Sequence, residues 1–271
     1  MAAIPEDILP ERIRARLTTR MIGCALTVVS EIGSTNEAAM AAGHAGAPEG
    51  LCLLADRQTS GRGRLNRTWS SLPGLGVYTS ILLRPAVPPD RAPILTLMAG
   101  CAVVEAIRMV AALQPQLKWP NDVLLEGKKV AGILTEMATL GSRVSHVVVG
   151  IGINVNHRAT DFPPEVRATA TSLALAGGRP VDRVEVILAL YGALERWYRL
   201  HESDGAAMIL ERARRAMATL GRDVVVQSPG AAWQGKAVDL DRDGALLVRD
   251  ATGTVQRVIA DDVSIREGTR S

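Results

Sequence analysis

The pattern of hydrophobic and polar positions changes once along the chain, near residue 220. Before that point, short apolar runs that suit buried strands alternate with longer segments of helical period. After it, short apolar runs follow one another closely, separated by turn residues at 241–244 and 252–253. This pattern predicts an α+β domain over residues 1–220 and a small all-β domain of SH3-like barrel type over 221–271.

In the first domain the pattern predicts strands where short apolar runs are bounded by turn residues: 25–31, 51–56, 76–84, 122–125, 130–137 and 147–155. Ser34 has the character of a helix N-cap in front of an alanine-rich segment. Residues 93–113 carry aliphatic side chains on several sides, which predicts a central helix, and 181–220 is helical in period. A tight hairpin is predicted at 126–128.

In the second domain, strands are predicted at 222–227, 233–241, 245–250, 254–260 and 262–266. Core candidates of the preceding helical segment are its largest apolar side chains: Leu188, Leu190, Leu194, Trp197 and Tyr198.

The composition is that of a soluble globular protein. Apolar residues make up 47% and charged residues 22% of the 271 positions, which excludes a disordered chain. The most apolar stretch, 94–113, contains Glu105 and Arg108, whereas a membrane span needs about 20 nearly uncharged residues. The first residues lack the apolar region of a signal peptide. The three cysteines lie far apart in apolar surroundings and are predicted to be buried free thiols in a reducing cytosol: Cys24, Cys52 and Cys101.

The net charge of +3 is too small to indicate a nucleic-acid partner by itself. The distribution of lysine is more informative, because lysine occurs only at positions 118, 128, 129 and 236 while every other basic residue is arginine. Lysine is a compact point charge and arginine a planar fork. The three lysines within 118–129 therefore indicate at least one position that requires a point charge.

Several familiar catalytic patterns are missing from the sequence. The segment Gly61-Arg62-Gly63-Arg64 is followed neither by the lysine of a P-loop nor by the third glycine of a dinucleotide fingerprint. The four histidines have no metal-ligand spacing, and no serine or cysteine lies in a recognisable nucleophile setting. No metal site is therefore predicted, and conventional acid–base or covalent catalysis finds no obvious residues.

The most unusual stretch is the arginine loop, which we define as residues 58–69. It carries Arg62, Arg64 and Arg67 on a glycine framework, with Trp69 directly behind, and backbone N–H groups in such a loop can point at an anion. Arginine adds bidentate contacts to phosphate or carboxylate. The alternative is a solvated surface loop with a core tryptophan.

Three further segments combine polar groups with strand-interior glycines. They are Lys118-Trp119-Pro120-Asn121-Asp122, then residues 129–136 with Gly132, and residues 150–156 with Asn154. A glycine inside a strand suggests close approach of a ligand, and the alternative for each is a bulge or tight packing.

Taken in order, these segments resemble the biotin–protein ligase family, also called biotin–acetyl-CoA-carboxylase ligase. The matching stretches are EIGSTNEAA at 31–39, ADRQTSGRGRLNRTWSS at 55–71, KWPNDVLLEGKKVAGILTE at 118–136 and GIGINVN at 150–156. GKAVDLDRDGALLVRD at 235–250 is similar to the family's small C-terminal domain. Asn66 stands where the family usually has glycine, and asparagine tolerates a positive φ better than most residues.

The resemblance implies a fold and a reaction. The fold would be α+β, with a mixed sheet and helices similar to class II aminoacyl-tRNA synthetases, plus an SH3-like barrel. The enzyme would activate biotin with ATP and Mg²⁺ to biotinyl-5′-AMP and pass biotin to one lysine of a biotin carboxyl carrier domain. The substrate carboxylate would be the nucleophile, so the protein need only orient and neutralise charge.

The resemblance also assigns the site. Lys129 and Arg64 would be catalytic. Biotin would be bound by Ser34, Thr35, Asn36, Gln58, Arg62, Gly63, Arg64, Lys129 and Gly132. ATP would be bound by Arg64, Trp69, Lys118, Asn121, Lys129 and Asn154, with Trp69 against adenine. The arginine loop would be mobile in the free enzyme and close over the ligand.

Several alternatives remain at this point. Lipoate–protein ligases and octanoyltransferases share the fold but lack the arginine loop followed by tryptophan. A nucleic-acid-binding module would use the arginines, but aromatic residues are only 3%. Residues 1–24 are fewer than the helix-turn-helix domain of family members that repress transcription, so we expect no DNA-binding domain. We expect a cytoplasmic enzyme without a nucleic-acid or membrane partner, and the resemblance is compatible with a homodimer.

Overall fold

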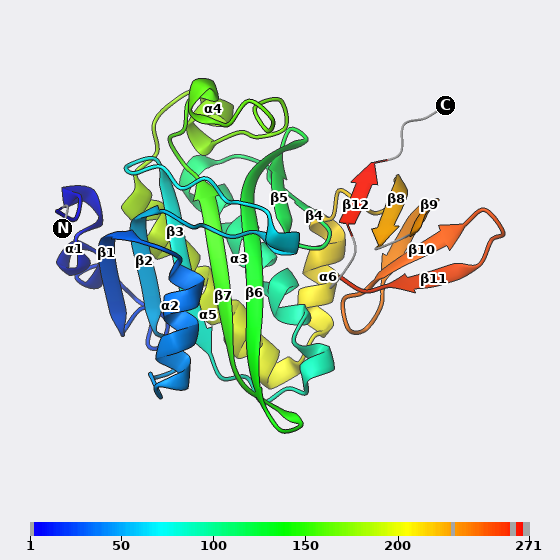
Figure 1. The fold of residues 1–271 in the computed structure, drawn as a ribbon, viewed down its shortest axis with the longest axis horizontal. Helices are drawn as coiled ribbons and strands as arrows, with labels where there is room; N and C mark the ends of the chain where they lie inside the picture. Colours follow the sequence, from blue (N-terminus) through cyan, green and yellow to red (C-terminus); the bar gives the residue numbers. More distant parts are fainter. Residues whose placement is uncertain (1–2, 229–230, 261–263, 268–271) are drawn as a thin grey trace.

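The protein contains two sheets, and the boundary between them lies near residue 220, where the hydrophobic pattern of the sequence changes (Figure 1). The computed structural model describes residues 3–228, 231–260 and 264–267. The larger sheet has the order β1-β2-β3-β7-β6-β5-β4, with β1 and β2 parallel and the other neighbours antiparallel. Its strands are β1 (Leu26–Ile32), β2 (Cys52–Gln58), β3 (Gly76–Leu83), β4 (Gln116–Lys118), β5 (Asp122–Leu125), β6 (Lys128–Leu140) and β7 (Arg143–Asn154).

Helices cover both faces of this sheet. On one face α2 packs against β2, β3 and β7, while α3 and α5 lie behind the sheet (Figure 1). The helices are α1 (Pro10–Arg14), α2 (Thr35–His44), α3 (Ile94–Ala111), α4 (Leu173–Gly177), α5 (Arg183–Asp204) and α6 (Ala207–Ala216). Short 3₁₀ turns are η1 (Glu6–Ile8), η2 (Arg64–Asn66), η3 (Pro89–Arg91) and η4 (Ala159–Asp161). The mixed sheet with helices confirms the predicted α+β class.

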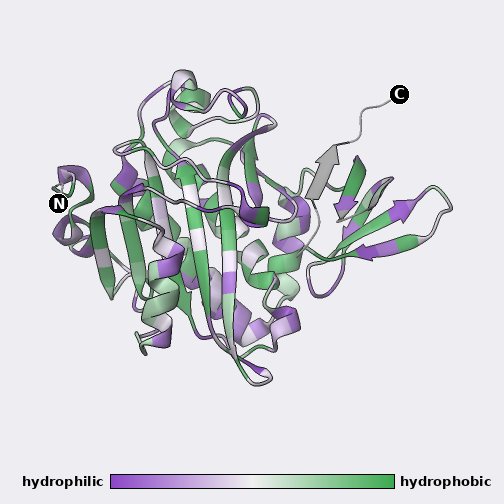
Figure 2. Ribbon diagram, in the orientation of Figure 1, coloured by the Kyte–Doolittle hydropathy of each residue, from purple (hydrophilic) through white to green (hydrophobic). Residues whose placement is uncertain are grey.

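The central helix α3 forms the middle of the hydrophobic core. Its apolar side chains are buried on nearly every side, from Leu95 to Ile107, against the sheet, α5 and α6. Residues 89–111 are long and apolar enough to pass for a membrane span, but most of this stretch is buried inside the protein. Figure 2 shows the same distribution, with hydrophobic central strands and hydrophilic residues at the ends and outer surfaces.

The second sheet is entirely antiparallel, in the order β11-β10-β9-β8-β12. Its strands are β8 (Asp223–Ser228), β9 (Ala231–Leu240), β10 (Leu246–Asp250), β11 (Val255–Val258) and β12 (Ser264–Glu267). This agrees with the predicted SH3-like domain, although residues 262 and 263 of the last predicted strand lie outside the described residues. Trp119 ties the two sheets together, because its indole Nε1 donates to the carbonyl of Gly244 at 3.0 Å.

The strongest local signals in the sequence predicted the helix cap and the hairpin turn correctly. Ser34 caps α2, accepting from the N–H of Glu37 at 3.5 Å. The predicted hairpin turn has φ of 49° at Glu126 and 77° at Gly127, the pair of positive values that a type I′ turn requires. The predicted segment 181–220 is two helices, because Gly205 with φ of 72° ends α5.

One prediction about the cysteines was wrong. Cys52 and Cys101 are buried, and burial raises the pKa of each thiol to about 12. Cys24 is exposed, because it stands just before β1 on the surface rather than inside the sheet. All three are free thiols.

Candidate active site

A cavity of about 1140 Å³ opens over the larger sheet, next to the arginine loop. Its walls come from the N-terminus of α2, the arginine loop, strands β4 to β7 and the irregular segment 157–170. The structure brings every predicted site residue to this one cavity: Ser34, Thr35, Asn36, Gln58, Arg62, Gly63, Arg64, Trp69, Lys118, Asn121, Lys129, Gly132 and Asn154.

A polar network fills the end of the cavity at α2. The backbone N–H and the hydroxyl of Thr35 both donate to Gln58 Oε1, at 2.8 and 3.0 Å. Gln58 Nε2 donates to Ser71 Oγ at 3.1 Å. The hydroxyl of Ser80 lies 2.7 Å from Thr35 Oγ1 and 2.6 Å from Asn36 Oδ1. These groups are fixed relative to one another before any ligand enters.

Asn36 is used mainly to attach α2 to the sheet. Its Nδ2 donates to the carbonyl of Leu134 at 3.1 Å and to Glu136 Oε2 at 2.7 Å, which accounts for both amide hydrogens. A Cβ on Gly150 would lie only 2.7 Å from Asn36 Cγ, so this close approach requires glycine. Asn36 therefore offers a ligand only its carbonyl oxygen, which Ser80 already shares.

The arginine loop is closed by its own backbone. Gly63 N–H donates to the carbonyl of Arg67 at 2.7 Å, and Trp69 N–H donates to that of Gly61 at 2.8 Å. At the tip, Leu65 and Asn66 have φ of 55° and 56°. Asn66 therefore occupies the left-handed conformation, which confirms that asparagine can replace glycine there.

The two inner arginines of the loop attach it to different parts of the protein. Arg62 pairs with Glu37 on α2 (Nε–Oε1 3.4 Å) and with Glu136 on β6 (Nη2–Oε1 3.2 Å). Arg64 donates to Asn121 Oδ1 at 3.3 Å and to the carbonyl of Ala260, which follows β11. The loop thus contacts both the larger sheet and the segment that follows β11 in the second domain.

Trp69 lies in a groove made by strand glycines. A Cβ on Gly132 would meet Trp69 Cζ3 at 3.0 Å, and a Cβ on Gly152 would meet Trp69 Nε1 at 2.6 Å. The Lys129 ammonium is 5.3 Å from the indole ring centre and pairs with Asp122 Oδ1 at 2.6 Å. The space that Gly132 was expected to leave for a ligand is occupied by Trp69 and Lys129 in this structure. Contact between Gly132 and biotin stays a prediction.

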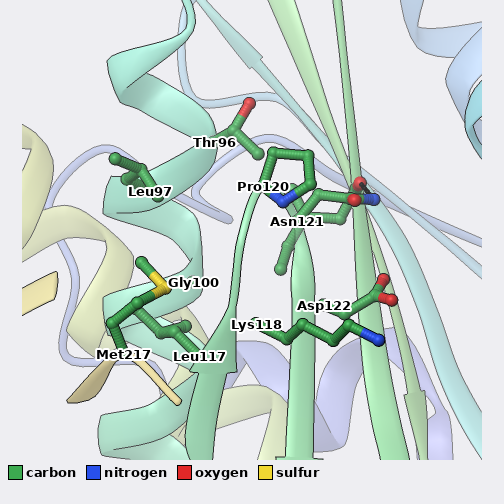
Figure 3. A pocket seen from close by; sticks show the side chains of 10 residues that line it. Thr96, Leu97, Gly100, Leu117, Lys118, Pro120, Asn121, Asp122 and Met217 are labelled. Atoms are coloured by element: carbon green, nitrogen blue, oxygen red, sulfur yellow. Dashed lines mark hydrogen bonds between the residues drawn. The ribbon is translucent and has the colours of Figure 1, made fainter. Parts of the chain in front are cut away.

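Positive charge surrounds the middle of the cavity. Lys118 and Lys129 line it from the strands, and Arg64 and Arg67 line it from the loop. Figure 3 shows a smaller pocket next to this cavity, in which the charged ends of Lys118 and Asp122 point away from Leu97 and Met217. Such a group of cations can neutralise a carboxylate and a phosphate that approach each other.

Two amides on this side of the cavity also hold backbone in place. Asn121 Nδ2 donates to the carbonyl of Ile133 at 2.8 Å, and Asn154 Nδ2 donates to that of Thr171 at 3.0 Å. Each amide keeps its position through the backbone of another segment, and both line the cavity.

Sequence reasoning missed the wall formed by residues 157–170. This segment is fixed to β6, because Lys129 N–H donates to the carbonyl of Thr169 at 2.7 Å. The His157 ring is 3.3 Å from the Tyr78 hydroxyl through Nε2 and stacks on Phe162 at 5.2 Å between ring centres. Burial lowers the pKa of His157 to about 4. The segment lacks any hydrophobic period, so its position directly after Asn154 was the only available signal.

Glu136, Ser71 and Ser80 were also missed as members of the polar network. They flank residues that the motifs contain, but a single polar residue in or near a strand carries no signal of its own. Among the described residues, no group of three or more His, Cys, Asp or Glu side chains could hold a metal ion.

Comparison with known proteins identifies the family. Residues 30–154 match the Biotin/lipoate A/B protein ligase family, and residues 219–266 match the Biotin protein ligase C terminal domain. The chain is 38% identical over 261 residues to the bifunctional ligase/repressor BirA of Bacillus subtilis, covering 96% of this chain and 80% of that protein. It is 36% identical over 244 residues to the biotin–[acetyl-CoA-carboxylase] ligase of Mycobacterium tuberculosis, covering 88% of each.

A solved structure agrees with the sequence matches. The biotin protein ligase from Aquifex aeolicus in complex with biotin and ATP superposes with a TM-score of 0.78 at 32% identity, covering 90% of this chain and all of that one. The two matched regions coincide with the two sheets, and the matched motifs line the cavity. The chain therefore belongs to the biotin protein ligase family.

Proposed function

We propose that this protein activates biotin with MgATP to biotinyl-5′-AMP and transfers the biotinyl group to a lysine of a biotin carboxyl carrier domain. It is an ATP-dependent biotin protein ligase. The relative from Mycobacterium tuberculosis is named a biotin–[acetyl-CoA-carboxylase] ligase, and the Aquifex aeolicus structure is a biotin protein ligase in complex with biotin and ATP. The observation that carries the proposal is the convergence of every predicted site residue on one cavity, which has a polar network at α2 and cationic side chains from the strands and the arginine loop.

The two ends of the cavity suit the two substrates. The network of Thr35, Gln58 and Ser71 offers fixed hydroxyl and amide groups to the ureido ring of biotin. Trp69 and Asn154 bound the part of the cavity that suits adenine. Lys118, Lys129, Arg64 and Arg67 lie where the biotin carboxylate and the phosphates would meet, with magnesium arriving as part of the MgATP substrate.

The reaction needs no general base on the protein. A biotin carboxylate oxygen attacks the α-phosphorus of ATP, the bond from that phosphorus to the bridging oxygen breaks, and pyrophosphate leaves. The carrier lysine amine then attacks the biotinyl carbonyl, AMP leaves, and the amine releases a proton. In the first step Lys129 and Arg64 offset the negative charge that gathers between carboxylate and phosphate, a stabilisation strengthened by exclusion of water.

The described part of the chain supports a ligase role for its N-terminal segment too. Ile8 and Ile13 are buried in the catalytic core, and Asp7 pairs with the buried Arg183 on α5 at 2.7 Å. This segment packs as part of the ligase fold. We propose a cytoplasmic reaction that involves neither a membrane nor a nucleic acid.

A reconstituted assay tests the proposal. The protein is incubated with MgATP, labelled biotin and a biotin carboxyl carrier fragment, and label on the carrier and released pyrophosphate are measured. We expect both, each dependent on MgATP. In a thermal-shift assay biotin should raise the melting temperature, because it binds only the native state, while lipoate and an oligonucleotide should not. Label transferred from lipoate instead of biotin would point to the lipoate branch of the family.

A further inference from the structure

A continuous chain of hydrogen bonds runs from the biotin end of the cavity to the arginine loop. It begins at Thr35 and Ser80, which lie 2.7 Å apart, and passes from Ser80 to Asn36 at 2.6 Å. It continues from Asn36 Nδ2 to Glu136 Oε2 at 2.7 Å and ends where Arg62 Nη2 meets Glu136 Oε1 at 3.2 Å. Glu136 is the one link in this chain that contacts both the cavity floor and the loop.

The carboxylate of Glu136 contacts both the buried network and the arginine loop. Oε2 accepts from Asn36, a residue 5% exposed and held by Ser80 and Leu134. Arg62 of the arginine loop donates to Oε1 at 3.2 Å and also lies 3.4 Å from Oε2. A carboxylate that a buried amide already holds in place loses little further conformational entropy when an arginine binds it. The entropic cost of ordering the loop is therefore smaller.

Ser80 gives this chain two alternative states. Its single hydroxyl hydrogen is within reach of both Thr35 Oγ1 and Asn36 Oδ1, and it can serve only one of them fully at a time. A ligand group that donates to Thr35 Oγ1 leaves the Ser80 hydrogen to Asn36. Hydrogen bonds in a chain polarise one another, so the bond from Asn36 to Glu136 strengthens as well.

We propose that Glu136 is a positioning residue that couples biotin binding at Thr35 and Asn36 to closure of the arginine loop through Arg62. The inference rests on the proposed function, because it assumes that biotin occupies the α2 end of the cavity. Glu136 acts on the loop and not on the reacting atoms. Because coupling between two sites is reciprocal, removing its charge weakens biotin-induced loop closure and biotin affinity by similar factors.

The test measures the loop itself. Trypsin cleaves after arginine, so the rates of cutting after Arg62, Arg64 and Arg67, followed by mass spectrometry, report how open the loop is. The variant is Glu136→Gln, which keeps an oxygen acceptor for Asn36 but loses the charge that pairs with Arg62. The matched control is Glu37→Gln, which removes the other partner of Arg62 at 3.4 Å without touching Asn36.

We expect biotin to slow cleavage of the wild-type loop and of Glu37→Gln, and to have much less effect on Glu136→Gln. The pair is partly exposed, with side chains 41% and 31% accessible, so a loss of about threefold to fivefold in biotin-induced protection is the expected size. Biotin affinity, measured by calorimetry, should fall by a similar factor of about threefold to fivefold. Release of biotinyl-5′-AMP from Glu136→Gln should rise by a similar factor. The double variant Glu136→Gln with Arg62→Gln should lose no more protection than Glu136→Gln alone.

Three results separate success from failure. Equal protection of the two glutamine variants would show that Glu136 is an ordinary surface acid. A loss of biotin affinity in Glu136→Gln without any loss of protection would show that it only supports the pocket, and either result overturns the inference. Failure of the wild-type protein to bind biotin would instead overturn the proposed function.

Discussion

Replacing Gly152 with alanine should weaken nucleotide binding while leaving biotin binding intact. Gly152 lies in β7 between its partners in β3 and β6, and the indole of Trp69 rests on it. A new Cβ would lie 2.6 Å from Trp69 Nε1 and 2.7 Å from Cζ2. Ordinary contact begins near 3.4 Å, so one of the two groups must move by about 1 Å.

The indole is the group that moves. The backbone of Gly152 is held by strands on both sides, whereas Trp69 is partly exposed, belongs to a loop and has no partner for its Nε1 in the described part of the chain. Overpacking costs about 1–3 kcal/mol when the surroundings are rigid, and a mobile neighbour places this case at the low end. For a protein of this size that corresponds to a fall of roughly 2–4 °C in melting temperature. If displacement of Trp69 removes about 1.4 kcal/mol from nucleotide binding, the KM for MgATP rises about tenfold.

The assay follows pyrophosphate release as MgATP is varied at saturating biotin, with biotin affinity measured separately by calorimetry. Gly150→Ala is the matched control on the same strand, because its Cβ would lie 2.7 Å from Asn36 Cγ in the buried network instead. This control should lose biotin affinity and stability. The reasoning fails if Gly152→Ala keeps the wild-type KM for MgATP, or if it loses biotin affinity as strongly as Gly150→Ala does.

Three further predictions concern charge in and around the cavity. Lys129→Ala should fold normally and lose about 10²–10³ in the rate of pyrophosphate release, while Lys128→Ala, at the exposed first residue of β6, should keep the wild-type rate. A wild-type rate in the folded Lys129→Ala protein would contradict the catalytic assignment. Arg64→Ala should weaken biotin binding and release biotinyl-5′-AMP, so that bystander proteins acquire biotin; labelling confined to the carrier would refute the closure of the loop. Burial lowers the pKa of His157 from 6.5 to about 4. Between these pH values the unfolded chain therefore binds more protons than the folded protein. Roughly 3 kcal/mol of the free energy of unfolding should be lost as the pH falls from 6.5 to 4. Denaturant unfolding across this range should show a smaller loss for His157→Gln, and an unchanged pH profile would refute the assignment.

Much of the site followed from local sequence. Ser34 before an alanine-rich run specified the start of α2, and the apolar runs specified most of the larger sheet. Asn66 retained a glycine-like conformation, as its side chain allows. These features depend on neighbours within a few residues, so a local pattern was sufficient to predict them.

Other elements left no readable pattern. The strand β4 and the helix α4 are too short to establish a period, and the wall at 157–170 is irregular. Their positions are set by contacts with distant strands, such as the bond from Lys129 to Thr169. Exposure of Cys24 likewise depends on where β1 begins at the edge of the sheet.

The sequence by itself determined the family, the chemistry of the motifs and a set of residues that line one cavity. Only the tertiary structure decided which contacts those residues make. The amide hydrogens of Asn36 bond to β6, Trp69 packs in the groove formed by the strand glycines, and Glu136 contacts both Asn36 and Arg62. The reason is sheet register. Pairing of β7 with β3 and β6 sets which side chain faces each glycine, and that pairing joins segments far apart in the chain.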